Sequence, residues 1–271
     1  MNVTKLRYEI ENIYSLPTIP PTLRKLILLI EDPNISIDEL AEFILRDTTL
    51  TARVIRAANS PIYGFTAKIT RVSQAIMMLG LNSIKGLLLG VTVFESLQET
   101  IVGLWEHSRG CALSARIIAE MTNNNDIVED MTIAGLIHDI GKVALTLKYP
   151  NEYANVINLA KQNQSHLIDE EKKIFDVTHA DVGSWLIYRW NFPLPFVEAV
   201  KYHHNTSQLK DNLKEASIVC LSNEITKSLG YGYSGERFLH NIGKEVFDVL
   251  NMDEDLLRRV LKVISSRLDE S

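Results

Sequence analysis

The sequence has few features of secreted, membrane-spanning or nucleic-acid-binding proteins. Its 271 residues include only two cysteines, Cys111 and Cys220. Both lie in apolar stretches with helical spacing, so we expect buried free thiols rather than a disulfide. The longest apolar run, from Gly86 to Phe94, is too short to cross a bilayer. The charged N-terminal segment lacks the apolar core of a signal peptide. These absences predict a cytoplasmic protein that does not enter the membrane.

Positive charge is also scarce, because 28 Lys and Arg residues are set against 34 Asp and Glu residues, for a net charge of −6. Generic nucleic-acid binding needs a basic face that displaces counterions, so this balance argues against it. Glycine and proline are not in excess, and the length is enough for one large domain or two small ones. The composition therefore predicts an ordinary globular protein.

Every periodic segment repeats its apolar residues at helical spacing, which predicts an all-α fold. Ser36-Ile37-Asp38-Glu39 has the pattern of a capping box, and Asp47 can cap the helix that follows. Gly80 is expected to end a further helix. We predict a smaller N-terminal helical subdomain over residues 1–97 and a larger helical subdomain over residues 98–271.

The chemistry is concentrated at an adjacent pair, His138 and Asp139, with Lys142 three residues further on. All three lie in the apolar, helix-like run of residues 134–145. Burying a carboxylate and an ammonium without partners costs roughly several kcal/mol. Either a salt-bridge network or a metal ion must compensate them, and the pair alone does not distinguish the two.

The other histidines help to decide this point. His107 lies on an apolar helical face, where the ordinary interpretation is a hydrogen-bonded core histidine. His179 begins a helix, where the dipole favours the neutral imidazole that binds metal. His203 and His204 lie near a helix end and could be a solvated cap. Two more, His166 and His240, are expected at the surface. Four separate helices thus carry inward histidines, which favours a metal.

Four separate motifs occur in the first third of the chain. They are Leu16-Pro17-x-x-Pro20-Pro21, Asp47-x-x-Leu50-x-x-Arg53-Val54, Ala58-Asn59-Ser60-Pro61-x-Tyr63-Gly64 and Ala75-Ile76-x-x-Leu79-Gly80. In this order they resemble the N-terminal signature of HDOD proteins, the HD-related output domains of bacterial signal transduction. The resemblance runs from about Leu16 to His204, and it departs at Thr48, where the family usually has proline.

The histidine order resembles the metal-dependent HD superfamily, and most closely its HD-GYP branch of cyclic-di-GMP phosphodiesterases. This resemblance implies an HD-like helical bundle, with Asp139 bridging two ions and Lys142 beside the scissile phosphate. Imidazole and carboxylate suit Fe, Mn or Zn, and paired ions about 3.5–4 Å apart activate a bridging water. The residues that match metal ligands are His107, His138, Asp139, His179, His203 and His204.

Two departures weaken the step from metal to catalysis. No Gly-Tyr-Pro motif follows His204, and Asn223 aligns with the last carboxylate ligand of the superfamily. An amide is a neutral and weaker ligand, so at least one ion would bind less tightly. Many HDOD proteins lack most of the metal set and are regarded as non-catalytic output modules.

Three hypotheses follow. The first, which the departures favour, is a cytoplasmic HDOD signalling protein that binds one or two divalent ions and acts by binding a protein partner or a nucleotide. The second is a metal-dependent phosphohydrolase of nucleotides or cyclic dinucleotides, with Asp139 and Lys142 in catalytic roles. The third is a metal-free polar network around His138 and Asp139. The sequence identifies neither the partner nor the ligand.

Overall fold

The structure, a computed structural model, describes residues 2–13, 21–63, 68–90, 101–209 and 211–270. All regular elements in these ranges are helices, which confirms the all-α prediction. Their bounds are α1 (Val3–Glu11), α2 (Pro21–Ile30), α3 (Ile37–Leu45), α4 (Thr48–Ala58), η2 (Pro61–Tyr63), α5 (Val72–Leu79), α6 (Leu81–Leu89), α7 (Leu104–Met121), α8 (Val128–Ile137), α9 (Ile140–Lys148), α10 (Pro150–Asn163), α11 (Leu167–Phe175), α12 (His179–Arg189), α13 (Leu194–Tyr202), η4 (Thr206–Gln208), α14 (Leu213–Ser228), α15 (Lys244–Val249) and α16 (Glu254–Asp269).

Local capping chemistry sets where several helices begin. Ser36 and Glu39 form the expected reciprocal capping box at the start of α3. The Asp47 side chain accepts hydrogen bonds from two backbone amides at the start of α4. Thr178 and Asp181 form a second capping box, which starts α12 at His179. Gly80 ends α5 with φ of +80°, a conformation that L side chains rarely adopt.

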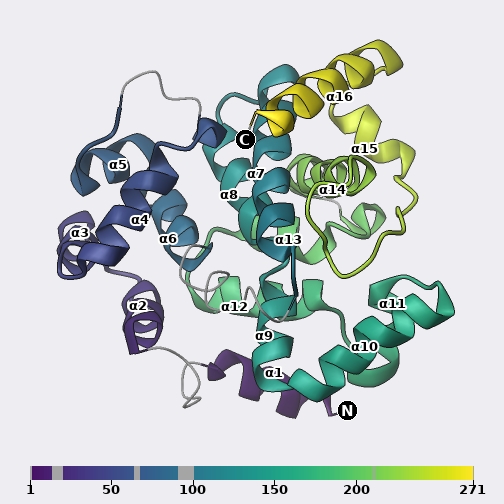
Figure 1. Ribbon diagram of the computed structural model, residues 1–271, viewed down its shortest axis with the longest axis horizontal. Coiled ribbons are helices and arrows are strands. Elements are labelled where there is room, and N and C mark those ends of the chain that lie inside the picture. Colours follow the sequence, from purple (N-terminus) through teal and green to yellow (C-terminus); the bar gives the residue numbers. More distant parts are fainter. Residues whose placement is uncertain (1, 14–20, 64–67, 91–100, 210, 271) are drawn as a thin grey trace.

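The helices form two groups that meet along α6, α7 and α8 (Figure 1). Helices α2 to α6 lie on one side, and α7 to α16 surround the long α7–α8 pair on the other. Helix α1 belongs spatially with the second group, because it packs on α9 and α12. One continuous hydrophobic core runs through both groups. The proposed boundary at residues 97 and 98 lies outside the described residues, so the two-subdomain division stays a prediction.

The His138–Asp139 pair does not lie inside one continuous helix. His138 ends α8 and Asp139 precedes the first residue of α9, so the chain turns at the pair. The Asp139 carbonyl accepts a bond from the Lys142 amide in this turn. Helical spacing alone cannot show such a break, since both flanking segments keep their apolar pattern. The turn directs both side chains into the space enclosed by α7, α12 and α13.

Outside the pair, two further expectations have an outcome here. Both cysteines are buried free thiols, as predicted. No single described helix is long and apolar enough to cross a membrane; α5 and α6 reach that length only together, and the two are bent by 114°.

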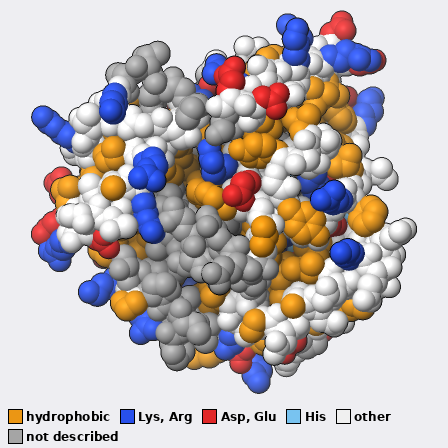
Figure 2. Space-filling view, viewed as in Figure 1, with side chains coloured by type: hydrophobic (Ala, Val, Ile, Leu, Met, Phe, Trp, Pro, Cys, Tyr) orange, Lys and Arg blue, Asp and Glu red, His pale blue; other side chains and the backbone are white. Residues whose placement is uncertain are grey.

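The HDOD motif residues 16, 17, 20 and 64 lie outside the described residues. Figure 2 shows charged groups of both signs over one face of the molecule, with Lys and Arg side chains numerous over the N-terminal helices.

Candidate metal centre

Four helix regions bring the candidate residues together. Helix α7 carries His107, the α8–α9 turn carries His138 and Asp139, and the start of α12 carries His179. His203 and His204 follow the end of α13. The backbones approach very closely at Gly141, where an added methyl carbon would lie 1.9 Å from the carbonyl oxygen of His179. Glycine there allows α9 and α12 to pack in contact, and this contact places His179 beside the His-Asp turn.

Asp139 lies at the middle of the cluster and is completely buried. Its two carboxylate oxygens face four imidazoles and one ammonium. From Oδ2, the distances are 2.7 Å to Lys142 Nζ, 3.2 Å to His138 Nε2 and 3.8 Å to His107 Nε2. From Oδ1, they are 3.2 Å to His179 Nε2 and 3.9 Å to His203 Nε2. The structure thus brings all the predicted residues except His204 directly around one carboxylate.

His204 joins the group through a neighbouring imidazole. Its Nε2 lies 3.1 Å from Nε2 of His179, and its ring centroid lies 4.0 Å from that of His203. Two basic nitrogens this close repel each other unless a proton or a cation lies between them. His204 is therefore positioned as a further candidate metal ligand on the His179 side of Asp139.

Hydrogen bonds at the far ring nitrogens orient three of the imidazoles. His138 Nδ1 donates to the Gly135 carbonyl at 2.8 Å, and His203 Nδ1 donates to the Val200 carbonyl at 2.6 Å. His179 Nδ1 lies 2.8 Å from the Glu171 carboxylate. Each bond leaves the Nε2 lone pair directed toward Asp139. This is the arrangement by which metal-binding proteins fix the tautomer and orientation of a ligating histidine.

Several buried atoms at this centre form no hydrogen bond of acceptable geometry with the described residues, although two of them lie 3.2 Å from a nitrogen or oxygen of a neighbouring side chain. They are His138 Nε2, His203 Nε2, Asp139 Oδ1 and His204 Nδ1. Leaving a buried polar atom unpaired costs about 1–3 kcal/mol, and more for a charged group. A divalent cation would satisfy the first three of these atoms at once. The donor types and their orientation therefore fit a metal ion better than a metal-free polar network.

Electrostatics keep most donors in the ligating form. Burial lowers the pKa of His107, His203 and His204 well below the ordinary value, so these imidazoles are neutral. For Asp139, burial opposes ionisation, but His138 and Lys142 outweigh it and hold the pKa well below its usual range. His179 differs: burial lowers its pKa, yet Glu171 and Asp139 raise it overall. A metal would compete with a proton at this one nitrogen.

Asn223 lies where the resemblance led us to expect it. Its Oδ1 is 3.1 Å from His107 Nε2, and the residue is buried. The same imidazole nitrogen lies 3.4 Å from Cys111 Sγ. Burial raises the pKa of that thiol above its ordinary range, so Cys111 is a protonated neighbour. Two neutral groups, Asn223 and Cys111, thus contact His107 Nε2.

The donors divide into overlapping groups whose atoms lie within 4.8 Å of one another. One contains His138, Asp139 and His203, and each of these groups could hold a metal ion. The others are His107, Cys111 and His138 on one side, and His179, His203 and His204 on the other; a further group joins His204 to Glu224 and His240.

Sequence reasoning missed one residue that orients the centre. Glu171 is completely buried, and besides His179 Nδ1 it accepts bonds from the His179 amide and the Tyr153 hydroxyl. A signal was available, because Glu171 occupies the apolar face of α11 between Leu167 and Phe175. A carboxylate on such a face needs a buried partner.

The interpretation of His240 as a surface residue was wrong, because its side chain is 11% exposed, whereas the His166 side chain is 35% exposed, as the surface prediction requires. The rings of His166 and His240 stack with centroids 4.0 Å apart, and His240 lies 4.4 Å from His204. With Glu236 they form a further group of donor atoms within 4.8 Å of one another. Their spacing in the sequence, 74 residues apart, conceals this contact.

The segment of residues 230–243 covers the centre, and its first part, residues 230–235, has the glycine-rich sequence that predicts a flexible turn. The Ser234 carbonyl accepts a bond of 2.8 Å from Lys142 Nζ, and the Tyr233 amide donates to the Gly103 carbonyl. Gly232 lies against the backbone of His107, where a methyl carbon would be 2.2 Å from the His107 nitrogen. Close contact with α7 therefore requires glycine at this position.

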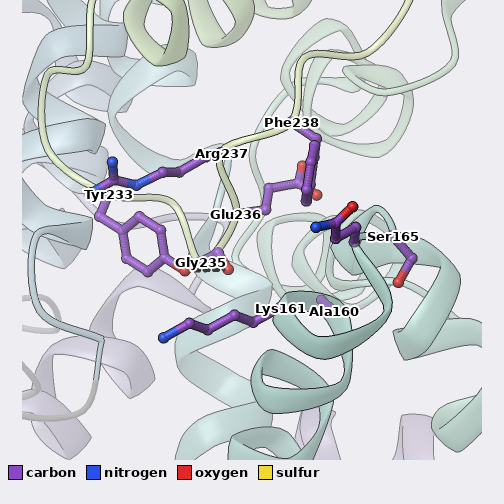
Figure 3. Close-up of a pocket in the computed structure, with 9 residues that line it drawn as sticks. Ala160, Lys161, Ser165, Tyr233, Gly235, Glu236, Arg237 and Phe238 are labelled. Carbon is purple, nitrogen blue, oxygen red and sulfur yellow. Dashed lines mark hydrogen bonds between the residues drawn. The ribbon is translucent and has the colours of Figure 1, made fainter.

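A cavity of about 520 Å³ lies on the outer side of this segment. Figure 3 shows Tyr233, Glu236, Arg237 and Phe238 on one side of it and Lys161 on the other, from the end of α10. None of the candidate metal donors is among its described lining residues. This opening in the surface therefore does not give access to Asp139.

The fold and the buried centre together define an all-helical protein of the HD-superfamily kind. The comparison with family models is more specific, because the HDOD domain model matches residues 16–206. The chain belongs to the HDOD family, as its sequence motifs indicated.

Solved structures agree with this assignment. An HDOD domain protein of unknown function from Geobacter sulfurreducens aligns at 26% identity with a TM-score of 0.65, over 99% of this chain and 95% of that one. A candidate signal transduction protein from Marinobacter aquaeolei VT8 aligns at 22% identity with a TM-score of 0.70, over 96% of this chain and 59% of that one. At its level of identity, the second similarity shows the fold alone.

One curated relative also matches. It is an uncharacterized protein of Treponema pallidum (strain Nichols), 27% identical over 217 residues, which are 78% of this chain and 42% of the relative. The chain thus aligns with less than half of the length of that relative.

Proposed function

We propose that this chain is a bacterial signal-transduction module that binds a divalent metal at the His-Asp centre and acts by binding a partner rather than by hydrolysis. The observation that carries the proposal is the convergence of buried donor atoms without hydrogen-bond partners: His138 Nε2, His203 Nε2 and Asp139 Oδ1. The Nδ1 atoms of His138 and His203 are already bonded to backbone carbonyls, so a cation is the group that suits the two Nε2 atoms and Asp139 Oδ1 together.

The proposed ligands are His107, His138, Asp139, His179, His203 and His204, with Asp139 between the two sides of the centre. Imidazole and carboxylate donors suit Fe, Mn or Zn. When bound, such an ion would supply Lewis acidity to an oxygen ligand. The chain's own contribution is to hold the imidazoles at fixed orientations and to keep the centre away from solvent.

Closure of the centre supports a binding role. Lys142, the residue that would meet a substrate phosphate, is 2% exposed. Its ammonium group is already bonded to Asp139 Oδ2 and to the Ser234 carbonyl. A substrate would have to displace residues 230–243 before reaching the Lys142 ammonium or the Asp139 carboxylate. The neutral Asn223 beside His107 also favours binding over hydrolysis, because an amide is a weaker metal ligand than the carboxylate of the superfamily.

A metal in a closed centre would act on the fold itself. A ligand that binds only the folded state raises the free energy of unfolding by RT ln(1 + [L]/Kd). The donors join α7, α12, α13 and the α8–α9 turn, so the metal would fix how these helices pack. We infer that metal occupancy sets the surface that a signalling protein recognises.

The alternative function is a metal-dependent phosphohydrolase of a nucleotide or cyclic dinucleotide. The contact of 2.7 Å between Lys142 Nζ and Asp139 Oδ2 favours it. A phosphohydrolase would need a positive group, here the Lys142 ammonium, beside its bridging carboxylate to offset charge on the phosphate. In that function, residues 230–243 would open during turnover.

Metal content of the purified full chain, grown in metal-replete medium, tests the proposal. We expect at least one ion per chain in the wild type and a loss of most metal in His138→Ala. Thr132→Ala is the matched control, since Thr132 is buried in the same helix and bonds only to the Val128 carbonyl. Metal near zero in the wild type would refute both metal functions.

The activity assay then separates the two functions. The metal-loaded chain is incubated with cyclic di-GMP and with a generic phosphodiester, and no turnover is expected. Turnover that disappears in Lys142→Ala would establish the phosphohydrolase instead.

A cytoplasmic location belongs to the proposal as well, supported by the two buried free thiols.

A further inference from the structure

A second concave site lies away from the metal centre, between the N-terminal helices and α7. It is a cleft of about 450 Å³, within the range of roughly 300–1,000 Å³ that small-molecule sites occupy. Helix α4 and the residues after it form one wall, and α7 with α8 forms the other. Its described lining residues are Arg53, Arg56, Ala57, Asn59, Ser60, Ile62, Tyr63, Leu87, Trp105, Arg109, Ala112 and Leu136.

Three arginines dominate the charge of this cleft. Arg53 and Arg56 are three residues apart on one face of α4, and Arg109 comes from α7 on the opposite wall. No Asp or Glu is among the described lining residues. Within the described ranges, Arg56 and Arg109 form no ion pair with a carboxylate. In a chain of net charge −6, this concentration of guanidinium groups marks a site for an anion.

The rest of the lining is mostly aromatic and apolar, with Asn59 and Ser60 as its polar members. Trp105 contributes a half-buried ring, and the buried residues Tyr63, Leu87, Ala112 and Leu136 lie behind it. Flat aromatic surfaces suit a planar heterocycle, because stacking adds to the burial of apolar area. Guanidinium groups pair with phosphate oxygens in a bidentate manner. The two kinds of surface together match one ligand that has both a ring and several negative charges.

We infer that this cleft binds a nucleoside polyphosphate, with the phosphates held by Arg56 and Arg109 and the base held against Trp105. The site is independent of the metal centre, since it shares no residue with the candidate donors. Helix α7 nevertheless borders both. Trp105, Arg109 and Ala112 follow one another along its cleft side, whereas His107 faces Asp139.

Binding of ATP and of GTP to the full chain, measured by calorimetry without added divalent metal, tests this inference. Inorganic tripolyphosphate serves as a probe of the charges alone. We expect saturable binding of at least one nucleotide, tighter than that of tripolyphosphate. Arg56→Gln and Arg109→Gln should each weaken nucleotide binding by about tenfold or more, because each removes a charged pair with phosphate. Absence of saturable binding up to millimolar nucleotide would overturn the inference.

Two further variants make the test specific. Arg237→Gln is the matched charge control, since Arg237 is an exposed arginine that lines the separate cavity of Figure 3. It should change affinity less than twofold, and a loss equal to that of Arg56→Gln would overturn the assignment to this cleft. Trp105→Leu should weaken nucleotide binding by about tenfold and leave tripolyphosphate binding unchanged. Trp105→Phe, which keeps a ring and fills the core better, should retain most nucleotide affinity.

Failure here and failure of the metal proposal are distinguishable. His138→Ala should lose metal but bind nucleotide as the wild type does, whereas Arg109→Gln should keep its metal. Loss of nucleotide binding in His138→Ala with an unchanged melting temperature would refute the independence of the two sites.

Discussion

The orienting role of Glu171 can be tested by a single-atom change, Glu171→Gln. Glu171 Oε2 lies 2.8 Å from both His179 Nδ1 and the His179 amide nitrogen, and Oε1 accepts a bond of 2.7 Å from the Tyr153 hydroxyl. A glutamine can keep its carbonyl oxygen toward His179 and turn its amino group toward the Tyr153 oxygen. The shape of the site is then retained and the negative charge is lost.

The expected effect is on metal affinity more than on folding. A carboxylate behind a ligating imidazole raises its basicity and fixes its tautomer, and removing such a partner typically costs 10–100-fold in metal affinity. At about 1.4 kcal/mol for each factor of ten, this is roughly 1.4–2.8 kcal/mol of binding free energy. The free energy of unfolding of the metal-free chain should fall by only about 1 kcal/mol, since most hydrogen bonds remain.

Glu170→Gln provides the matched control. Glu170 is the adjacent residue in α11, is 1% exposed and accepts bonds from Asn163, Ser165 and Lys173, but it contacts none of the candidate donors. Competition with a chromogenic chelator measures the affinity of each variant for Zn²⁺ and Mn²⁺. Wild-type affinity in Glu171→Gln, or an equal loss in Glu170→Gln, would refute the role of Glu171.

Three other predictions follow from single contacts. Lys173 and Ser165 hold the pKa of Glu170 at about 2, below the ordinary value of 4.5. The ionised carboxylate thus stabilises the fold above about pH 4.5, and this contribution disappears as the pH falls toward 2. Urea unfolding should show Glu170→Gln about 1 kcal/mol less stable at pH 7, with the gap narrowing below pH 4.5; a gap independent of pH would contradict this. Asn223→Asp should raise metal affinity by about tenfold or more, because it places a carboxylate 3.1 Å from His107 Nε2; chelator competition would contradict the prediction if affinity stayed the same. Gly141→Ala should lower the unfolding free energy by about 1–3 kcal/mol and reduce metal content, because its methyl carbon would lie 1.9 Å from the His179 carbonyl oxygen. An unchanged urea midpoint would show that α9 and α12 can separate without cost.

Local features of this protein were readable from the sequence for a physical reason. A capping box such as Ser36 with Glu39 acts over three residues, and so does Thr178 with Asp181. The helical class follows from apolar spacing that repeats within each segment. The candidate donors were also identifiable, because imidazole and carboxylate at apolar positions need compensation wherever they are buried.

Features that depend on distant segments were not readable in this way. Asn223 meets His107 across 116 residues of chain, and its place was expected only through a family resemblance. Glu171 was missed, and His240 was taken for a surface residue although its ring stacks on that of His166. Each of these errors concerns which helices become neighbours, a choice that is made by packing.

The His-Asp pair shows where the division lies. The sequence determined that the Asp139 carboxylate and the Lys142 ammonium, next to His138, would need compensation if buried. Only the tertiary structure decided that α8 ends at the pair, that four imidazoles converge on Asp139, and that Ser234 closes over Lys142. Burial cost is a property of the residues themselves, whereas the partners that offset it are set by contacts between helices far apart in the chain.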